Sequence, residues 1–141
     1  MKISARNMLA GTVRKVTLGA VNAEIKLMLE GGEEVVAIIT NDSARHLGLK
    51  EGVRAYAVLK ASWLILGKGV DASRLSARNV LRGKVVRVEE GSVNNEVVLQ
   101  LAGGAELTSI ITRESSHALG LKPGEDADVI FKANNVIVAV D

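Results

Sequence analysis

LMLEGGEEVVAIITNDSARHLGL, residues 27–49, contains a strand–turn–strand–helix pattern. The apolar segments on either side of Gly31-Gly32 are typical of two strands joined by a tight turn. The residues from Asn41 onward favour about two helical turns, and Gly48 is suited to end the helix. This stretch therefore predicts a β-hairpin followed by one short helix.

The same pattern returns 72 positions later as LQLAGGAELTSIITRESSHALGL, residues 99–121, where Gly120 is the expected helix end. The alignment extends over the whole chain without a gap. It predicts two modules, residues 1–69 and 73–141, joined by a short linker at about 68–72 that contains glycine.

Each module also contains segments with strand character outside this stretch. In the first module, GTVRKVTL alternates apolar and polar residues, and RAYAVLKA and WLIL are rich in strand-forming residues. Five strands with one short helix between the third and the fourth are typical of a small OB-type barrel. We therefore expect an all-β protein with two tandem OB-like five-stranded barrel modules, each with one short helix. Modules of this size bury small cores, so we also expect an oligomer.

The composition excludes several functional classes. Aromatic residues are 2% of the chain, so aliphatic side chains must fill the core, and the absence of cysteine excludes thiolate metal sites. A net charge of +2 is too small to indicate nucleic-acid binding. The N-terminus resembles neither a signal peptide nor a membrane span, which favours a soluble cytoplasmic protein. The two histidines, His46 and His117, do not align between modules, and no nucleophile–base pair or acidic cluster is present. We therefore expect neither an enzyme nor a repeated metal site.

A few polar residues recur in both modules although most polar surface positions have diverged. They are Ser4, Arg6 and Asn7 with Ser76, Arg78 and Asn79; Asn22 and Glu24 with Asn94 and Glu96; Thr40 and Ser43 with Thr112 and Ser115; and Lys60-Ala61 with Lys132-Ala133. Arginine and lysine with several hydroxyls are suited to hold an oxyanion. The threonines can also begin the short helices, whose first turn favours an anion.

Each of these residues also has a purely structural interpretation. Thr40 and Thr112 can simply cap their helices, the arginines and lysines can be solvated or pair with Glu24, and Asn22 and Asn94 can form turns. The joint recurrence of the whole set favours a binding site over these separate roles.

Four ordered motifs, each present twice, resemble those of the Mop or molbindin family. They are SARN, GAVNAE or GSVNNE, IIT-x-x-S, and KAS or KAN before a terminal strand. The resemblance implies a cytoplasmic protein, not an enzyme, that binds molybdate, with tungstate as an analogue, and stores molybdenum for cofactor synthesis. It also implies that six modules form one particle, so that this chain would be a homotrimer, with no nucleic acid or membrane as partner.

The resemblance also implies which residues bind molybdate between modules. One module would supply the SARN and KAS residues and its neighbour the threonine and serine, which gives Ser4, Ala5, Arg6, Lys60, Ala61, Ser62, Thr40 and Ser43, and from the second module Ser76, Ala77, Arg78, Lys132, Ala133, Thr112 and Ser115. A second class of site would use the turns Ala20, Val21, Asn22 and Ser92, Val93, Asn94. The metal is bound only as its oxyanion. The second module departs from the pattern at Asn134, where the first has Ser62.

Two other functions remain as alternatives. A molybdate-responsive regulator that binds a partner protein would use the same module. An OB-fold protein that binds single-stranded nucleic acid would stack bases on aromatic residues. The chain has one Trp, one Tyr and one Phe, and none recurs between modules.

Overall fold

The computed structural model describes all residues, 1–141, and contains ten strands, two α-helices and three short 3-10 helices. The first repeat contains β1 (Asn7–Leu18), β2 (Asn22–Leu29), β3 (Glu34–Thr40), α1 (Asn41–His46), β4 (Arg54–Leu59), η1 (Ala61–Trp63) and β5 (Ile65–Gly67). After η2 (Ala72–Arg74), the second contains β6 (Asn79–Glu90), β7 (Asn94–Leu101), β8 (Glu106–Thr112), α2 (Arg113–Leu119), β9 (Asp126–Phe131), η3 (Ala133–Asn135) and β10 (Ile137–Ala139). The prediction of two OB-like modules, each with five strands and one short helix, is confirmed.

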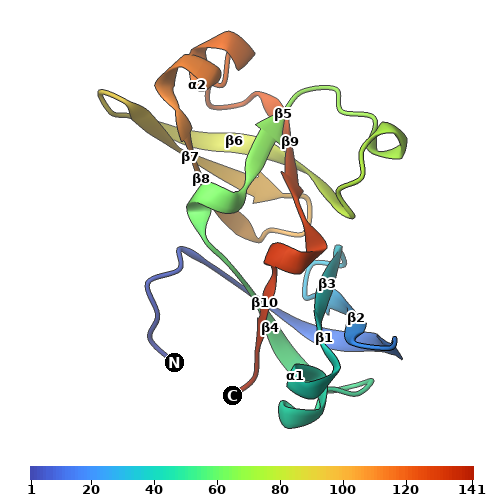
Figure 1. Ribbon diagram of the computed structural model, residues 1–141. Coiled ribbons are helices and arrows are strands. Elements are labelled where there is room, and N and C mark those ends of the chain that lie inside the picture. Colours follow the sequence, from blue (N-terminus) through green and yellow to red (C-terminus); the bar gives the residue numbers. More distant parts are fainter.

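The fifth strand of each sheet comes from the other repeat. The strand orders are β10-β4-β1-β2-β3 and β5-β9-β6-β7-β8. Thus β10, at the end of the chain, pairs with β4, and β5 pairs with β9. Figure 1 shows β5 in green among the strands of the second repeat and β10 in red among those of the first. This differs from the expectation that each module would be closed by its own last strand.

The long first strand of each sheet bends because it carries a β-bulge. The register shifts between Val13 and Lys15 against β2, and between Val85 and Arg87 against β7. Bulges increase strand bending and twist, which lets the five strands of each sheet curl around a core. The buried side chains of both repeats form one cluster of 27 residues, and Leu64 and Leu66 belong to it although their segment lies with the second sheet. The two repeats therefore share one core.

Both helices begin and end as the sequence predicts, with one difference. The threonine side chains of Thr40 and Thr112 cap them. Gly120 ends α2 in the left-handed conformation, at φ 62°. In the first repeat Leu47 is the C-cap residue, and Gly48, at φ 65°, follows it. The glycine therefore has the left-handed conformation in both repeats.

The two Gly-Gly turns pack against each other. A Cβ atom added to Gly31 would lie 2.5 Å from the Cα atom of Gly103, which no side chain tolerates without backbone movement. The turns of the two hairpins therefore approach each other backbone to backbone, and glycine is required at this contact.

The segment that joins the repeats is fixed to the second sheet. The amide of Val70 donates to the carboxylate of Asp128 at 2.9 Å, and Lys68 lies 3.4 Å from Glu125. Asp128 is buried, at 3% exposure. The segment is thus anchored directly after β5, which holds that strand in the sheet of the other repeat.

Candidate oxyanion-binding sites

The asparagine of each SARN motif binds the edge strand of the other repeat. The Asn79 side chain accepts a hydrogen bond from the amide of Val36 and donates to its carbonyl, both at 2.8 Å. Asn7 does the same with Thr108, at 2.7 and 2.8 Å. Each asparagine side chain thereby pairs with the edge strand β3 or β8 of the other repeat. An unpaired edge could otherwise pair with another chain. The recurrence of asparagine in SARN is explained by this contact.

The arginine of each SARN motif reaches a carboxylate of the other repeat. Arg6 lies 2.9 Å from Glu96, and Arg78 lies 2.9 Å from Glu24. The interpretation that a recurring arginine pairs with Glu24 is thus correct for Arg78, and the pairing crosses between repeats. In the register of β7 and β8, Glu96 lies opposite Ile110, so its side chain shares a face with residues 94 and 112.

The threonine and serine before each helix form one capping unit. Thr112 accepts from the amide of Ser115 at 3.1 Å and donates to its hydroxyl at 2.8 Å. Thr40 and Ser43 have the same contacts, at 3.0 and 2.9 Å. The predicted cap is confirmed. All four residues are exposed, and each serine retains a hydroxyl proton that can be donated to a ligand.

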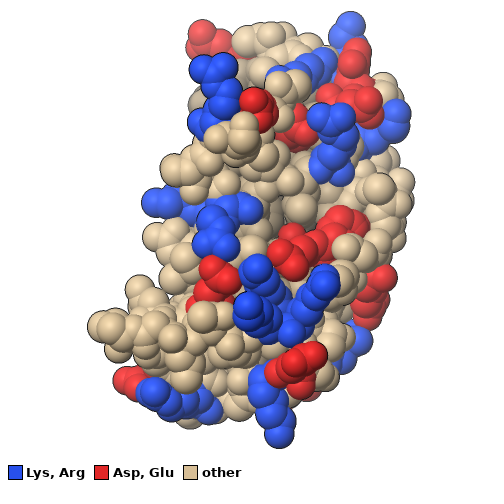
Figure 2. Space-filling view, turned by 90° about the vertical axis from the view of Figure 1, so that its right-hand side faces the viewer, with Lys and Arg blue, Asp and Glu red and all other residues tan.

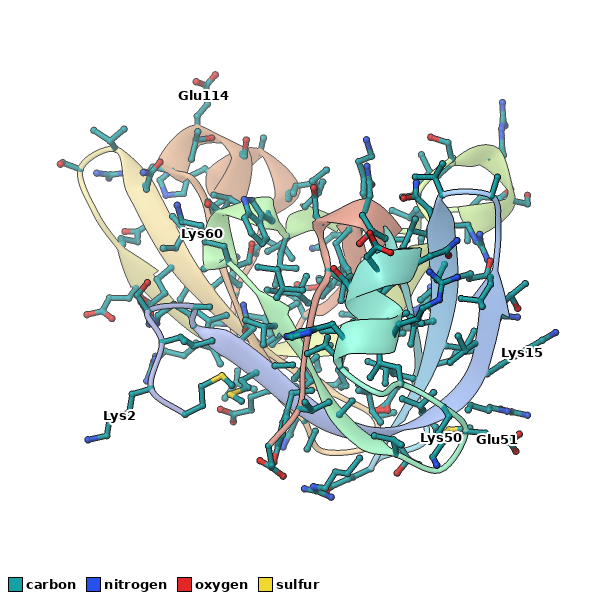
Figure 3. The ribbon with its side chains drawn as sticks, turned by 60° about the horizontal axis from the view of Figure 1, so that its bottom comes forward. Lys2, Lys15, Lys50, Glu51, Lys60 and Glu114 are labelled. Carbon is teal, nitrogen blue, oxygen red and sulfur yellow. The ribbon has the colours of Figure 1, made fainter.

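The KAS segment of the first repeat lies on the second. Element η1 packs on β8, and η3 packs on β3 in the equivalent position. Ser62, Thr112 and Ser115 line one pocket of about 590 Å³, together with Asn94 at the start of β7. Lys60, which directly precedes η1, is exposed on the same side as α2, the helix that carries Glu114 in Figure 3.

The predicted residues fall into two equivalent groups. The SARN and KAS segments of the first repeat lie against β8, and those of the second lie against β3. Neither Lys60 nor Lys132 forms an ion pair, so both are free to meet an anion. Ala61 and Ala133 are buried below them. Ser4 and Ser76 are exposed, Ala5 and Ala77 half-buried, and the two serines make no side-chain hydrogen bond.

The two groups are not identical. The pocket beside β8 has Ser62 and Ala118 in its lining. At the equivalent positions beside β3 stand Asn134 and His46. A serine hydroxyl beside a methyl group leaves more room for an anion than an amide beside an imidazole ring.

The two turns predicted as a second class of site lie exposed at one end of each sheet. Val21 and Val93 are 69% and 71% exposed. Their carbonyls accept from the amides of Asn41 and Arg113, each at 2.8 Å, which ties each turn to the start of a helix. Asn22 and Asn94 begin β2 and β7 directly opposite the capping threonines. Ala20 and Ser92 are exposed in these turns.

The turn of the second repeat is more acidic than that of the first. Glu89 and Glu90 precede it, where the first repeat has Thr17 and Leu18. His117 lies 2.5 Å from Glu90, and this hydrogen bond holds the pKa of Glu90 below its ordinary value. The residues around the two turns thus differ in charge although the backbone is repeated.

The sequence predicted Glu24 only as a partner of a recurring basic residue and gave Glu96 no role. Their signal was present, since both recur between repeats, but a recurring glutamate gave no reason to look near an oxyanion. On the face shown in Figure 2, basic and acidic side chains are interspersed. Taken together, each group offers hydrogen-bond donors, one arginine and one lysine near a strand end.

Comparison with known families identifies the repeated unit. A family model described as the TOBE domain matches residues 3–66 and again residues 75–138. The chain belongs to the TOBE-domain family. The resemblance of the TOBE repeats to the Mop or molbindin family is confirmed by their relatives.

Two relatives resemble the TOBE repeats over different lengths. The molybdenum-pterin-binding protein MopA of Rhodobacter capsulatus is 46% identical over 140 residues, which are 99% of this chain and 53% of MopA. The chain thus spans about half the length of MopA. The molybdenum-pterin-binding protein 3 of Clostridium pasteurianum is 47% identical over 64 residues, 45% of this chain and 94% of that protein, which corresponds to a single TOBE repeat.

The crystal structure of ModG, a cytoplasmic molybdate-binding protein, with molybdate bound, superposes on the two TOBE repeats with a TM-score of 0.96. The sequences are 50% identical, and the alignment covers 100% of both chains. The pairing of two TOBE repeats is therefore a shared arrangement. Neither α-helix of this structure could span a membrane.

Proposed function

We propose that this protein binds molybdate, and tungstate as its analogue, at sites between TOBE repeats. The observation that carries the proposal is the pocket in which Ser62 of the first repeat meets Thr112 and Ser115 of the second. Arg6 is held on the same face of the second sheet by Glu96. The similarity to molybdate-bound ModG over the whole chain supports the same ligand.

The chemistry of the grouped residues fits a tetrahedral dianion. An arginine and a lysine compensate two negative charges, which a partly buried anion requires. Hydroxyls and amides donate to the remaining oxygen lone pairs. Phosphate carries a proton near neutral pH and needs an acceptor for it, so a site built from donors disfavours phosphate. Sulfate has the charge of molybdate and no proton, so only the size and spacing of the site can reject it.

The binding residues in this proposal fall into two groups and a second class. They are Ser4, Ala5, Arg6, Lys60, Ala61 and Ser62 with Thr112 and Ser115; Ser76, Ala77, Arg78, Lys132 and Ala133 with Thr40 and Ser43; and, for the second class, the turns at 20–22 and 92–94. The relatives are binding proteins, and the proposed role is storage of molybdate in the cytoplasm rather than catalysis. A trimer of this chain would place further repeats against the exposed Val21 and Val93 turns.

Titration calorimetry with molybdate tests the proposal, with sulfate and phosphate as competing anions. We expect tight molybdate binding at more than one ion per chain and little heat from the other anions. Arg6→Gln together with Arg78→Gln should abolish most of the binding. Arg14→Gln is the control, since Arg14 lies on β1 and pairs with Glu34 at 3.9 Å. Unchanged affinity in the double variant excludes the arginines, and no heat from the unaltered protein excludes the function.

A further inference from the structure

Both SARN arginines are occupied by a carboxylate in this structure. In each pair one guanidinium nitrogen lies 2.9 Å from a glutamate oxygen of the other repeat. The side chains of Arg6 and Arg78 are 48% and 46% exposed, whereas those of Glu96 and Glu24 are 22% and 28% exposed. The same pairing is therefore formed in both repeats.

The carboxylates lie beside the groups that would bind the oxyanion. Glu96 is opposite Ile110, and Asn94, two residues away on the same face, is opposite Thr112. Residues diagonal across two strands are about 7–8 Å apart, within reach of an arginine side chain. Asn94 and Ile110 line both the pocket that contains Glu96 and the pocket that contains Thr112. Arg6 can therefore donate hydrogen bonds either to the carboxylate of Glu96 or to an anion bound at Thr112.

A carboxylate and an oxyanion compete for the same donors. Each presents charged oxygens that accept from the planar fork of a guanidinium group. We propose that Glu24 and Glu96 act as internal anions, which occupy the arginines in the empty protein and are displaced by the ligand. This inference rests on the proposed function. The measured affinity for molybdate then reflects the difference between how strongly the ligand and the glutamate bind the same arginine.

The displacement is easier at the site that contains Arg6. Arg87 lies 3.6 Å from Glu96, so this carboxylate retains one positive partner after Arg6 leaves. The equivalent position in the first repeat is Lys15, which forms no ion pair and points away from the sheet in Figure 3. Glu24 has Arg78 as its only charged partner. The Arg6 site should therefore fill before the Arg78 site.

The glutamate that competes also limits which anions bind. An anion that contacts only the arginine replaces one carboxylate–arginine contact with a similar contact, so its net gain in binding free energy is small. An anion that also reaches the lysine and the capping hydroxyls gains additional contacts. The internal carboxylate thus discriminates against weakly held anions without any contact between it and the ligand.

Glu96→Gln and Glu24→Gln, each measured by molybdate calorimetry, test the inference. Glutamine keeps the size of the side chain and removes the competing charge. We expect each variant to bind molybdate ~3- to 10-fold more tightly at the corresponding site, the range of a charged hydrogen bond against a neutral one. Glu34→Gln is the matched control, because Glu34 pairs with Arg14 at the far end of β3 and should leave the affinity unchanged.

The sign of the change separates competition, which predicts tighter binding, from a positioning role, which predicts weaker binding, and a double-variant cycle tests whether Glu96 acts through Arg6. If Glu96 acts through Arg6, Glu96→Gln should have no effect on binding in a protein that already carries Arg6→Gln. Equal or weaker molybdate binding by both glutamate variants, with the unaltered protein still binding, overturns the inference and leaves the proposed function standing. No molybdate heat from the unaltered protein or from any variant overturns both.

Discussion

Replacing Asn79 by alanine should strongly destabilise the protein, although Asn79 follows closely after the segment that joins the two repeats. Asn79 is 2% exposed, and its side chain makes two hydrogen bonds of 2.8 Å with Val36, which is 6% exposed. Each bond contributes about 1 kcal/mol net, and a buried backbone group left without a partner costs about 1–3 kcal/mol. We expect a loss of about 2–4 kcal/mol in the free energy of unfolding.

Urea denaturation followed by circular dichroism measures this loss. With a denaturant dependence of about 2 kcal/mol per M, the midpoint should fall by about 1–2 M. Asn7→Ala should cost less, about 1–2 kcal/mol, because Thr108 is half-buried and water can reach the groups it leaves. Lys50→Ala, at an exposed turn, is the control (Figure 3). A loss below about 0.5 kcal/mol for Asn79→Ala, or a larger loss for Asn7→Ala than for Asn79→Ala, contradicts this role of the two buried hydrogen bonds.

Three further outcomes are expected. Removing residues 137–141 should expose β4 of the first repeat to hydrogen exchange, because β10 pairs with it, and unchanged protection there contradicts the strand exchange. Gly31→Ala should lower the melting temperature, since its Cβ would meet Gly103, while a neutral effect would mean that the turns separate freely. Because the hydrogen bond to His117 lowers the pKa of Glu90, this pair stabilises the fold above the ordinary carboxyl pKa, and the stabilisation is lost as the pH falls through the folded-state pKa. In His117→Ala, an NMR titration should show a higher pKa of Glu90 than in the unaltered protein. An unchanged pKa contradicts the pairing.

The periodicity of the sequence was sufficient to predict the strands and the two α-helices, but not the three 3-10 helices. Alternating apolar residues indicated β1 and β2, the glycines indicated their turns, and Thr40 and Thr112 marked both helix starts. These features depend on neighbouring residues only, which explains why they can be read without a structure.

The exchange of β5 and β10 could not be predicted in the same way. Both strands are short and apolar, and each would complete the sheet of either repeat with the same side chains buried. The choice depends on the path of the chain through η1 and on the contacts of the junction, such as that between Val70 and Asp128. Local patterns carry no information on that path.

The sequence predicted which residue types form the candidate site, but only part of their arrangement in space. Recurrence identified Arg6 and Thr112, but it could not distinguish Asn7, which pairs with an edge strand, from residues free to bind a ligand. The role of Glu96 depends on a contact across repeats, and its recurrence alone does not show which residue it contacts.

The exchange of the closing strands also determines how the protein responds to dilution. A chain with one repeat of this kind would have to obtain its fifth strand from a second molecule, and closure would depend on protein concentration. Here β5 and the segment up to β6 connect the two sheets covalently, so each closing strand is present at a fixed, high effective concentration. The fold of this chain should therefore be complete at any concentration, even where contacts between chains are lost.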